Sequence, residues 1–194
     1  MADLLQYPAK ICLTVGGTLV HQGKILLIKH KKLGIWLNPG GHIEPNEVPH
    51  QTAEREFWEE TGVKVRAIST EPLPAQLAAD NSQYLPTPFL TNLHWVSQKN
   101  YQERTAAGEP IPLNPQMKKL DSTADKKWSR GCEQHLNFLF LLKLATPDGS
   151  TAYKQNLDES DGIGWFTLEE ALALPTNDNI RFEIKKAFEL RQSK

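Results

Sequence analysis

The stretch GHIEPNEVPHQTAEREFWEETGV, residues 41–63, decides the fold because a glycine loop leads directly into a strongly acidic helical segment. We predict that the helix begins at Asn46, a good N-cap, and ends at Gly62, a typical helix stop. Ala53 and Phe57 lie four residues apart and share one apolar face. This face should pack the helix against a hydrophobic core.

Three glutamates of this helix, Glu56, Glu59 and Glu60, fall on one side of it and should repel one another. Arg55 reaches Glu59 at i+4, which leaves Glu56 and Glu60 without a local cation. A solvated acidic surface is one interpretation. A hard divalent cation such as Mg²⁺, which prefers oxygen ligands, is the other, and the adjoining glycine loop and apolar anchor favour it.

Length and composition favour one domain of ordinary size. The 194 residues carry 22 Lys and Arg against 23 Asp and Glu, so the charge balance does not favour nucleic acid as a partner. Cys12 and Cys132 lie far apart in the sequence and lack metal-ligand spacing. Together with the lack of a recognisable signal peptide, this predicts a reducing, cytoplasmic setting. No stretch approaches the roughly 20 apolar residues of a membrane span, so we expect no membrane association.

Apolar periodicity predicts a mixed β-sheet between α-helices, and hence an α/β fold. A hairpin is expected first, from two apolar runs separated by HQG. Residues 98–132 show no clear periodicity and are predicted to form a long loop or lid insertion. The predicted strands are 10–20, 24–30, 63–70, 91–97 and 135–145, followed by a strand and helix in 163–174 and an amphipathic helix over 179–192.

The acidic segment resembles the Nudix box at every defining position and spacing. The matching residues are Gly41, Glu47, Arg55, Glu56, Phe57, Glu59, Glu60, Gly62 and Val63. The chain is therefore similar to Nudix hydrolases. This resemblance implies a single domain over residues 1–194 with an α/β/α sandwich architecture, and the insertion at about 98–132 is the part that it does not explain.

The resemblance also implies a reaction. Family enzymes cleave the pyrophosphate bond of a nucleoside diphosphate linked to another moiety, using Mg²⁺ or Mn²⁺, and release a nucleoside monophosphate. By resemblance, Glu47 and Arg55 form a pair that braces the glycine loop and orients Glu59. The implied metal ligands are the Gly40 carbonyl, Glu56, Glu59 and Glu60.

The general base stays open at this point. A box glutamate, Glu56 or Glu59, is favoured, and the loop acids Asp158, Glu159 and Asp161 are alternatives.

Two histidines are further candidates. His42 follows the paired glycines and His135 begins an apolar strand, with His94 on an earlier one. His42 or His135 could contact a substrate phosphate, or the histidines could be hydrogen-bonded structural residues. Glu159 is a further candidate for substrate binding.

The expected partner is a small molecule derived from a nucleotide, and the resemblance also implies a homodimer. A non-catalytic nucleotide sensor is one alternative function. An RNA 5'-end processing hydrolase is another, and it rests on the basic residues around Trp128 in the insertion.

Overall fold

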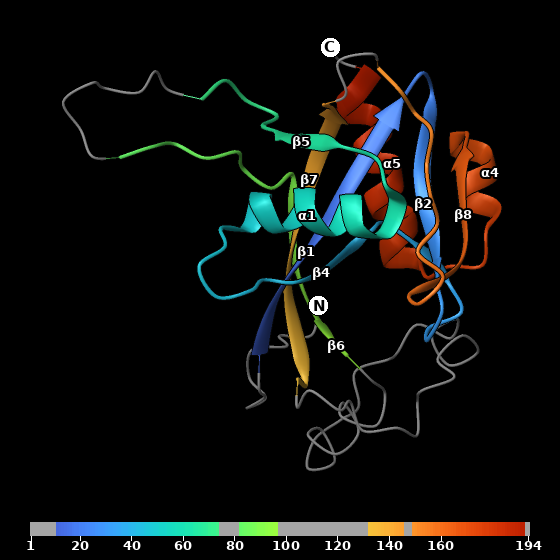
Figure 1. Cartoon of the computed structure of the whole chain (residues 1–194), viewed down its shortest axis with the longest axis horizontal. Coiled ribbons are helices and arrows are strands. Elements are labelled where there is room, and N and C mark those ends of the chain that lie inside the picture. Colours follow the sequence, from blue (N-terminus) through green and yellow to red (C-terminus); the bar gives the residue numbers. More distant parts are fainter. Residues whose placement is uncertain (1–10, 74–81, 97–131, 146–148, 193–194) are drawn as a thin grey trace.

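The N-terminal hairpin is present as predicted. The computed structural model describes residues 11–73, 82–96, 132–145 and 149–192 (Figure 1). Strands β1 (Ile11–His21) and β2 (Lys24–His30) pair antiparallel around Gln22 and Gly23. Both turn residues have φ in the left-handed region, at 48° and 73°, which matches the tight hairpin turns that follow the twist of the strands.

A mixed sheet forms around β7 (Gln134–Leu144), which confirms the predicted fold class. Strand β7 runs parallel to β1, from the pair Ile11 and Gln134 to the pair Leu19 and Leu142. Its other edge pairs antiparallel with β5 (Val65–Ile68) and β6 (Leu90–Trp95).

The second edge of β1 is shared by two strands. The short β4 (Gly40–His42) pairs with its first half and β2 with its end. Strand β2 then pairs with β3 (Trp36–Leu37) and β8 (Ser160–Phe166). This arrangement sets the glycine loop beside the centre of the sheet.

Helices cover both faces of the sheet, as an α/β/α sandwich requires. Figure 1 shows α1 (Pro49–Thr61) in front of β1 and β7, with α5 (Asp178–Gln192) on the far side. Ala53 and Phe57 of α1 are fully buried in one core cluster, which confirms the predicted anchor. The second cluster receives the apolar side of α5, as expected for the predicted amphipathic helix; its buried residues are Ile180, Ile184, Ala187 and Phe188.

The start of α1 differs from the prediction. The helix begins at Pro49 with Val48 as N-cap, and Asn46 lies outside it with φ of 70°. A residue in the left-handed region cannot begin a right-handed helix, and a residue before proline is held extended, as Val48 is. Glu47 therefore precedes the helix. The predicted end at Gly62 is confirmed, since its N–H donates to the Trp58 carbonyl at 2.7 Å.

The C-terminal region follows the predicted order of strand and helix. Strand β8 leads into α4 (Leu168–Ala173), which begins with a capping box between Thr167 and Glu170. The insertion predicted at 98–132 lies outside the described residues except for Cys132. Among the helices that the structure describes, none combines the length and apolarity needed to cross a membrane.

Candidate functional site

The glycine loop approaches α1 so closely that side chains are excluded at both glycines. A Cβ atom on Gly41 would lie 2.3 Å from Glu56 Oε1, and one on Gly40 would lie 2.1 Å from the Val15 carbonyl oxygen. The Gly40 N–H donates to Glu60 Oε2 at 2.8 Å. The loop is therefore hydrogen-bonded to Glu60 and lies against Glu56, two of the three glutamates that the resemblance implies as metal ligands.

Arg55 connects the loop side of the site with the helix. Its Nε donates to Glu47 Oε1 at 2.6 Å and its Nη2 to Glu47 Oε2 at 3.0 Å, which gives a bidentate pair. Arg55 also donates to the His42 carbonyl oxygen at 3.4 Å. The hydrogen bonds from Arg55 and Thr52, the Arg55 contribution being the largest, lower the pKa of Glu47 to about 2. The predicted pairing of Glu47 with Arg55 is present.

One electrostatic prediction was wrong. Glu56 was expected to lack a local cation, yet Arg55 Nη1 lies 2.9 Å from Glu56 Oε1 and 2.9 Å from Glu59 Oε2. Arg55 and Glu56 are adjacent in the helix and were therefore not expected to pair. The Arg55 side chain bends toward Glu47, which places its guanidinium between the carboxylates of Glu56 and Glu59. Arg55 thus contacts three glutamates at once.

Glu60 is the most unusual carboxyl group of the site. Its side chain is 2 % exposed, and burial raises its pKa to about 9, with further contributions from the neighbouring Glu159 and Glu56 charges. The hydrogen bond from Gly40 opposes this shift. Burial also raises the pKa of Glu56, against the effect of Arg55. Ionisation of these crowded carboxyl groups is therefore disfavoured without a cation, and a divalent cation with a preference for oxygen ligands fits this set of donors.

Glu159 joins this cluster from a distant part of the chain. Its carboxyl group contributes, after burial, to the raised pKa of Glu60 and adds negative charge near Glu56. The turn before β8 holds it there, with the Lys31 N–H donating to its carbonyl oxygen at 2.9 Å. In the described part of the chain, neither Asp158 nor Asp161 makes a hydrogen bond or ion pair with these carboxylates.

The histidine candidates gather on the opposite side of β4. The ring centroids of His42 and His135 are 4.9 Å apart, and those of His94 and His135 are 5.4 Å apart. Burial lowers the pKa of His94 to about 4, and burial with the two adjacent histidines lowers that of His135 to about 3. At neutral pH His135 is uncharged, so it could contact a phosphate only through a ring N–H and not as a cation.

A buried carboxyl group continues this polar cluster toward α5. Asn92 Oδ1 lies 2.9 Å from His94 Nδ1, and Asn92 Nδ2 donates to Glu183 Oε1 at 3.0 Å. Glu183 is 7 % exposed, and burial raises its pKa to about 7 against the effect of the amides of Asn92 and Asn38. Nothing in the apolar pattern of α5 indicated a buried acid.

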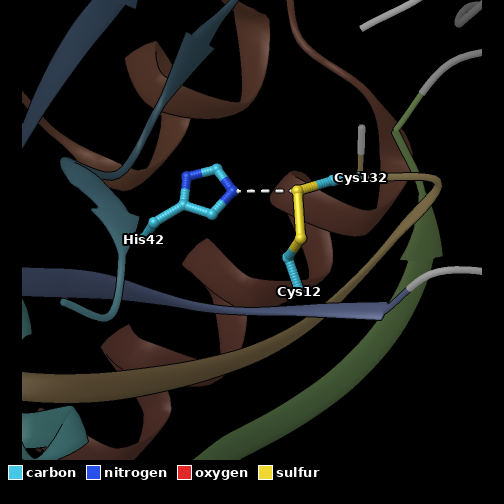
Figure 2. Close-up of side chains that lie close together, drawn as sticks. All are labelled: Cys12, His42 and Cys132. Atoms are coloured by element: carbon cyan, nitrogen blue, oxygen red, sulfur yellow. Dashed lines mark hydrogen bonds between the residues drawn. A yellow bond between two sulfur atoms is a disulfide. The ribbon is translucent and has the colours of Figure 1, made fainter. Parts of the chain in front are cut away.

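The two cysteines lie far apart in the sequence and were not expected to interact, but the structure pairs them. Cys12 and Cys132 form a disulfide with their Cα atoms 5.7 Å apart, although 120 residues separate them. His42 Nε2 lies 3.5 Å from Cys132 Sγ (Figure 2). The parallel pairing of β1 with β7, in which Cys12 stands opposite His135, brings them together. This pairing cannot be deduced from cysteine spacing.

A hollow of about 760 Å³ runs along the outer side of α1. Its lining includes Arg55, the half-exposed Trp58 and Arg66. It offers an aromatic surface and cations beside the carboxylate cluster.

A family model, two partial relatives and a solved structure were found to be similar to this chain. The model of the NUDIX domain matches residues 12–116. A MutT-like protein from Streptomyces ambofaciens is 42% identical over 53 residues, which cover 27% of this chain and 34% of that protein. The phosphatase NudJ from Escherichia coli strain K12 is 29% identical over 85 residues, covering 43% of this chain and 56% of NudJ. The chain thus matches about a third to a half of the length of these relatives.

A solved structure supports the fold. A hydrolase of the NUDIX family from Clostridium perfringens superposes with a TM-score of 0.62 at 22% identity, covering 92% of this chain and 97% of that one. The glycine loop and the acidic helix both lie inside the domain match, which spans more than half of the chain. The protein belongs to the NUDIX domain family.

Proposed function

We propose that this protein is a metal-dependent pyrophosphohydrolase that cleaves a nucleoside diphosphate linked to another moiety and releases a nucleoside monophosphate. The observation that carries the proposal is the buried carboxyl group of Glu60, held by the Gly40 N–H and surrounded by Glu56 and Glu159. Such a crowd of carboxyl groups is costly unless a cation offsets it. The names of the relatives, which include a phosphatase, support hydrolysis of phosphate compounds in general.

Mg²⁺ or Mn²⁺ fits the donors, and the groups that would hold it are the Gly40 carbonyl, Glu56, Glu59 and Glu60. When bound, the metal ions would offset the charge of the pyrophosphate and stabilise the leaving oxygen. Arg55 would keep Glu56 and Glu59 oriented, because its guanidinium contacts both at 2.9 Å. Glu47 would hold that guanidinium in place through its bidentate contact.

The general base is proposed to be one of two kinds of residue. The box glutamates Glu56 and Glu59 both accept a hydrogen bond from Arg55, and burial raises the pKa of Glu56 against the effect of that contact. Glu159 is exposed and contributes, after burial, to the raised pKa of Glu60. Substituting Glu59 and Glu159 separately by glutamine, and measuring metal affinity together with rate, distinguishes a base from a ligand: loss of the base lowers kcat and leaves metal affinity unchanged.

The substrate is proposed at the level of its class. Its pyrophosphate would lie at the carboxylate cluster, and the adjacent hollow with Trp58 could receive the rest of the nucleotide. A cytoplasmic setting and a homodimer remain predictions from the sequence and the resemblance. The basic residues that suggested RNA processing lie outside the described residues.

A turnover screen tests this function. The panel contains nucleoside triphosphates, oxidised nucleotides, nucleotide sugars, ADP-ribose, NADH, dinucleoside polyphosphates and capped RNA, each with Mg²⁺ or Mn²⁺, and mass spectrometry identifies the products. A metal-dependent reaction that yields a nucleoside monophosphate supports the proposal. Thermal stabilisation by a nucleotide without turnover would support the sensor alternative instead.

A further inference from the structure

Three side chains with soft or borderline ligand atoms meet at the end of the sheet, apart from the carboxylate cluster. They come from three strands or their ends: Cys12 from β1, His42 from β4 and Cys132 from the residues before β7. One ligand atom from each lies within 4.8 Å of the other two. Figure 2 shows the His42 ring pointing at the two sulfurs.

The spacing of these atoms suits a tetrahedral zinc ion. With Zn–S of about 2.3 Å and Zn–N of about 2.05 Å, the tetrahedral angle sets nitrogen and sulfur ligands about 3.6 Å apart. His42 Nε2 already lies 3.5 Å from Cys132 Sγ. The two sulfurs, which are bonded in this structure, would have to separate to about 3.8 Å in such a site. Rotation of the two cysteine side chains could supply this change, because the sulfurs are the ends of single-bonded side chains.

The imidazole is held in place by the fold. His42 stands opposite Thr14 in the β1 and β4 pairing, and its ring packs edge-on against His135. Cys132 is 2 % exposed, whereas Cys12 and His42 are half-buried. A site with one buried and two partly accessible ligands is shielded and still open to metal and reductant.

We propose that, when the disulfide is reduced, Cys12, Cys132 and His42 bind one zinc-like metal ion, with the fourth position left to solvent. The disulfide and the metal site use the same sulfurs and exclude each other. In a reducing compartment the thiol form is the expected one. The proposal goes beyond the hydrolase function and does not depend on it.

The chemistry balances as follows. A phosphine reductant takes one oxygen atom from water and becomes a phosphine oxide, while the two sulfurs of the disulfide gain two electrons and two protons and become thiols. Zn²⁺ then replaces the proton of each thiol, and two protons are released. In a cell, a dithiol would replace the phosphine and would itself be oxidised to a disulfide.

Ligand chemistry separates this site from the carboxylate cluster. Thiolate and imidazole select zinc and related metals, whereas carboxylates select Mg²⁺ and Mn²⁺. An excess of Mg²⁺ therefore occupies the carboxylate cluster, so that a softer metal added afterwards reports binding at the cysteines and His42. Thiolate-to-cobalt charge-transfer absorption reports the sulfur ligands alone.

The test is a titration of the full chain with Co²⁺, after phosphine reduction under anaerobic conditions and in excess Mg²⁺. We expect one equivalent of Co²⁺ with a thiolate charge-transfer band, which Zn²⁺ abolishes. Zn²⁺ should also protect two thiols from alkylation, as counted by mass spectrometry. The oxidised protein should give neither result.

Variants assign the ligands. Cys12→Ser and Cys132→Ser should each lose stoichiometric binding, and His42→Gln, which keeps both thiols, should weaken it by at least about tenfold. His21→Gln is the matched control, because His21 lies on the far end of β1 against Trp165, and it should bind as the wild type does. The proposal is overturned if the reduced wild type gives no charge-transfer band, if the oxidised protein binds equally well, or if His42→Gln leaves affinity unchanged. Circular dichroism of each reduced sample verifies that it is folded.

Discussion

Replacing Glu60 by glutamine separates what its buried carboxyl group does for stability from what it does for catalysis. The pKa of Glu60 is about 9 in the folded protein, against an ordinary value of 4.5. Because the folded-state pKa is raised, the free energy of unfolding decreases as the pH rises from the ordinary value to about 9. At pH 7 this decrease is about 3 kcal/mol, from about 2.5 pH units at about 1.4 kcal/mol each.

Glutamine has nearly the same shape, carries no charge and can still accept the Gly40 hydrogen bond. In the absence of metal, Glu60→Gln should therefore be more stable than the wild type at pH 7, by up to about 3 kcal/mol or roughly 6–12 °C in Tm. Urea unfolding and calorimetry in EDTA measure this. Mg²⁺ should then raise the Tm of the wild type more than that of the variant.

The same substitution should impair the reaction. If Glu60 holds a metal ion at the reacting phosphate, kcat should decrease by at least about 100-fold, equivalent to about 2.7 kcal/mol. Glu189→Gln is the control, since Glu189 lies on α5, on the other side of the sheet, and pairs with Lys186 at the surface, and its kcat should stay unchanged. Lower stability of Glu60→Gln in EDTA would refute the burial argument. A decrease in kcat of less than about threefold would remove Glu60 from the reaction.

Three further substitutions test other parts of the site and the core. Arg55→Lys cannot keep the bidentate contact, so kcat should decrease at least about tenfold, and the pKa of Glu47, measured by NMR titration, should rise from about 2 toward its ordinary value. Gly41→Ala places a Cβ 2.3 Å from Glu56 Oε1, and the displaced carboxylate should lower kcat by up to about 100-fold while circular dichroism shows an intact fold. Glu183→Gln removes a buried carboxyl group whose pKa is about 7. Because that pKa is raised, the wild type loses stability between about pH 4.5 and 7, so the variant should be more stable by up to about 3 kcal/mol at pH 8.5 and by less than about 1 kcal/mol at pH 5 in urea unfolding. An equal difference at both pH values would contradict this reasoning.

Features encoded by neighbouring residues could be predicted from the sequence. The side of α1 that carries the glutamates follows from their i, i+3 and i+4 spacing, and its anchor follows from Ala53 and Phe57. The hairpin turn and the end of α1 each depend on a glycine in the left-handed conformation, Gly23 and Gly62. A glycine that interrupts an apolar run is visible in the sequence itself, so both features could be predicted. The start of α1 was placed too early because Asn46 is as typical of a left-handed turn as of an N-cap.

Features that depend on the pairing of distant strands could not be predicted. Glu159 reaches the carboxylate cluster because β8 pairs with β2 and because the Lys31 N–H holds its backbone. The cysteines meet because β1 and β7 are parallel and in a particular register. One residue of slip in that register would turn Cys12 to the other face of the sheet, away from His42. Sequence spacing carries no information about such a register.

The short strand β4 would keep the two proposed metal sites, which differ in ligand preference, apart from each other. Successive residues of a strand face opposite sides of the sheet. Gly41 faces α1, where its Cβ position meets the Glu56 carboxylate, and His42 therefore faces the other side, where it meets Cys132 and His135. A carboxylate ligand and a thiolate ligand cannot reach across the sheet to the same ion. The proposed Mg²⁺ or Mn²⁺ site and the proposed zinc site thus lie on opposite faces of the sheet, because successive residues of β4 face opposite sides.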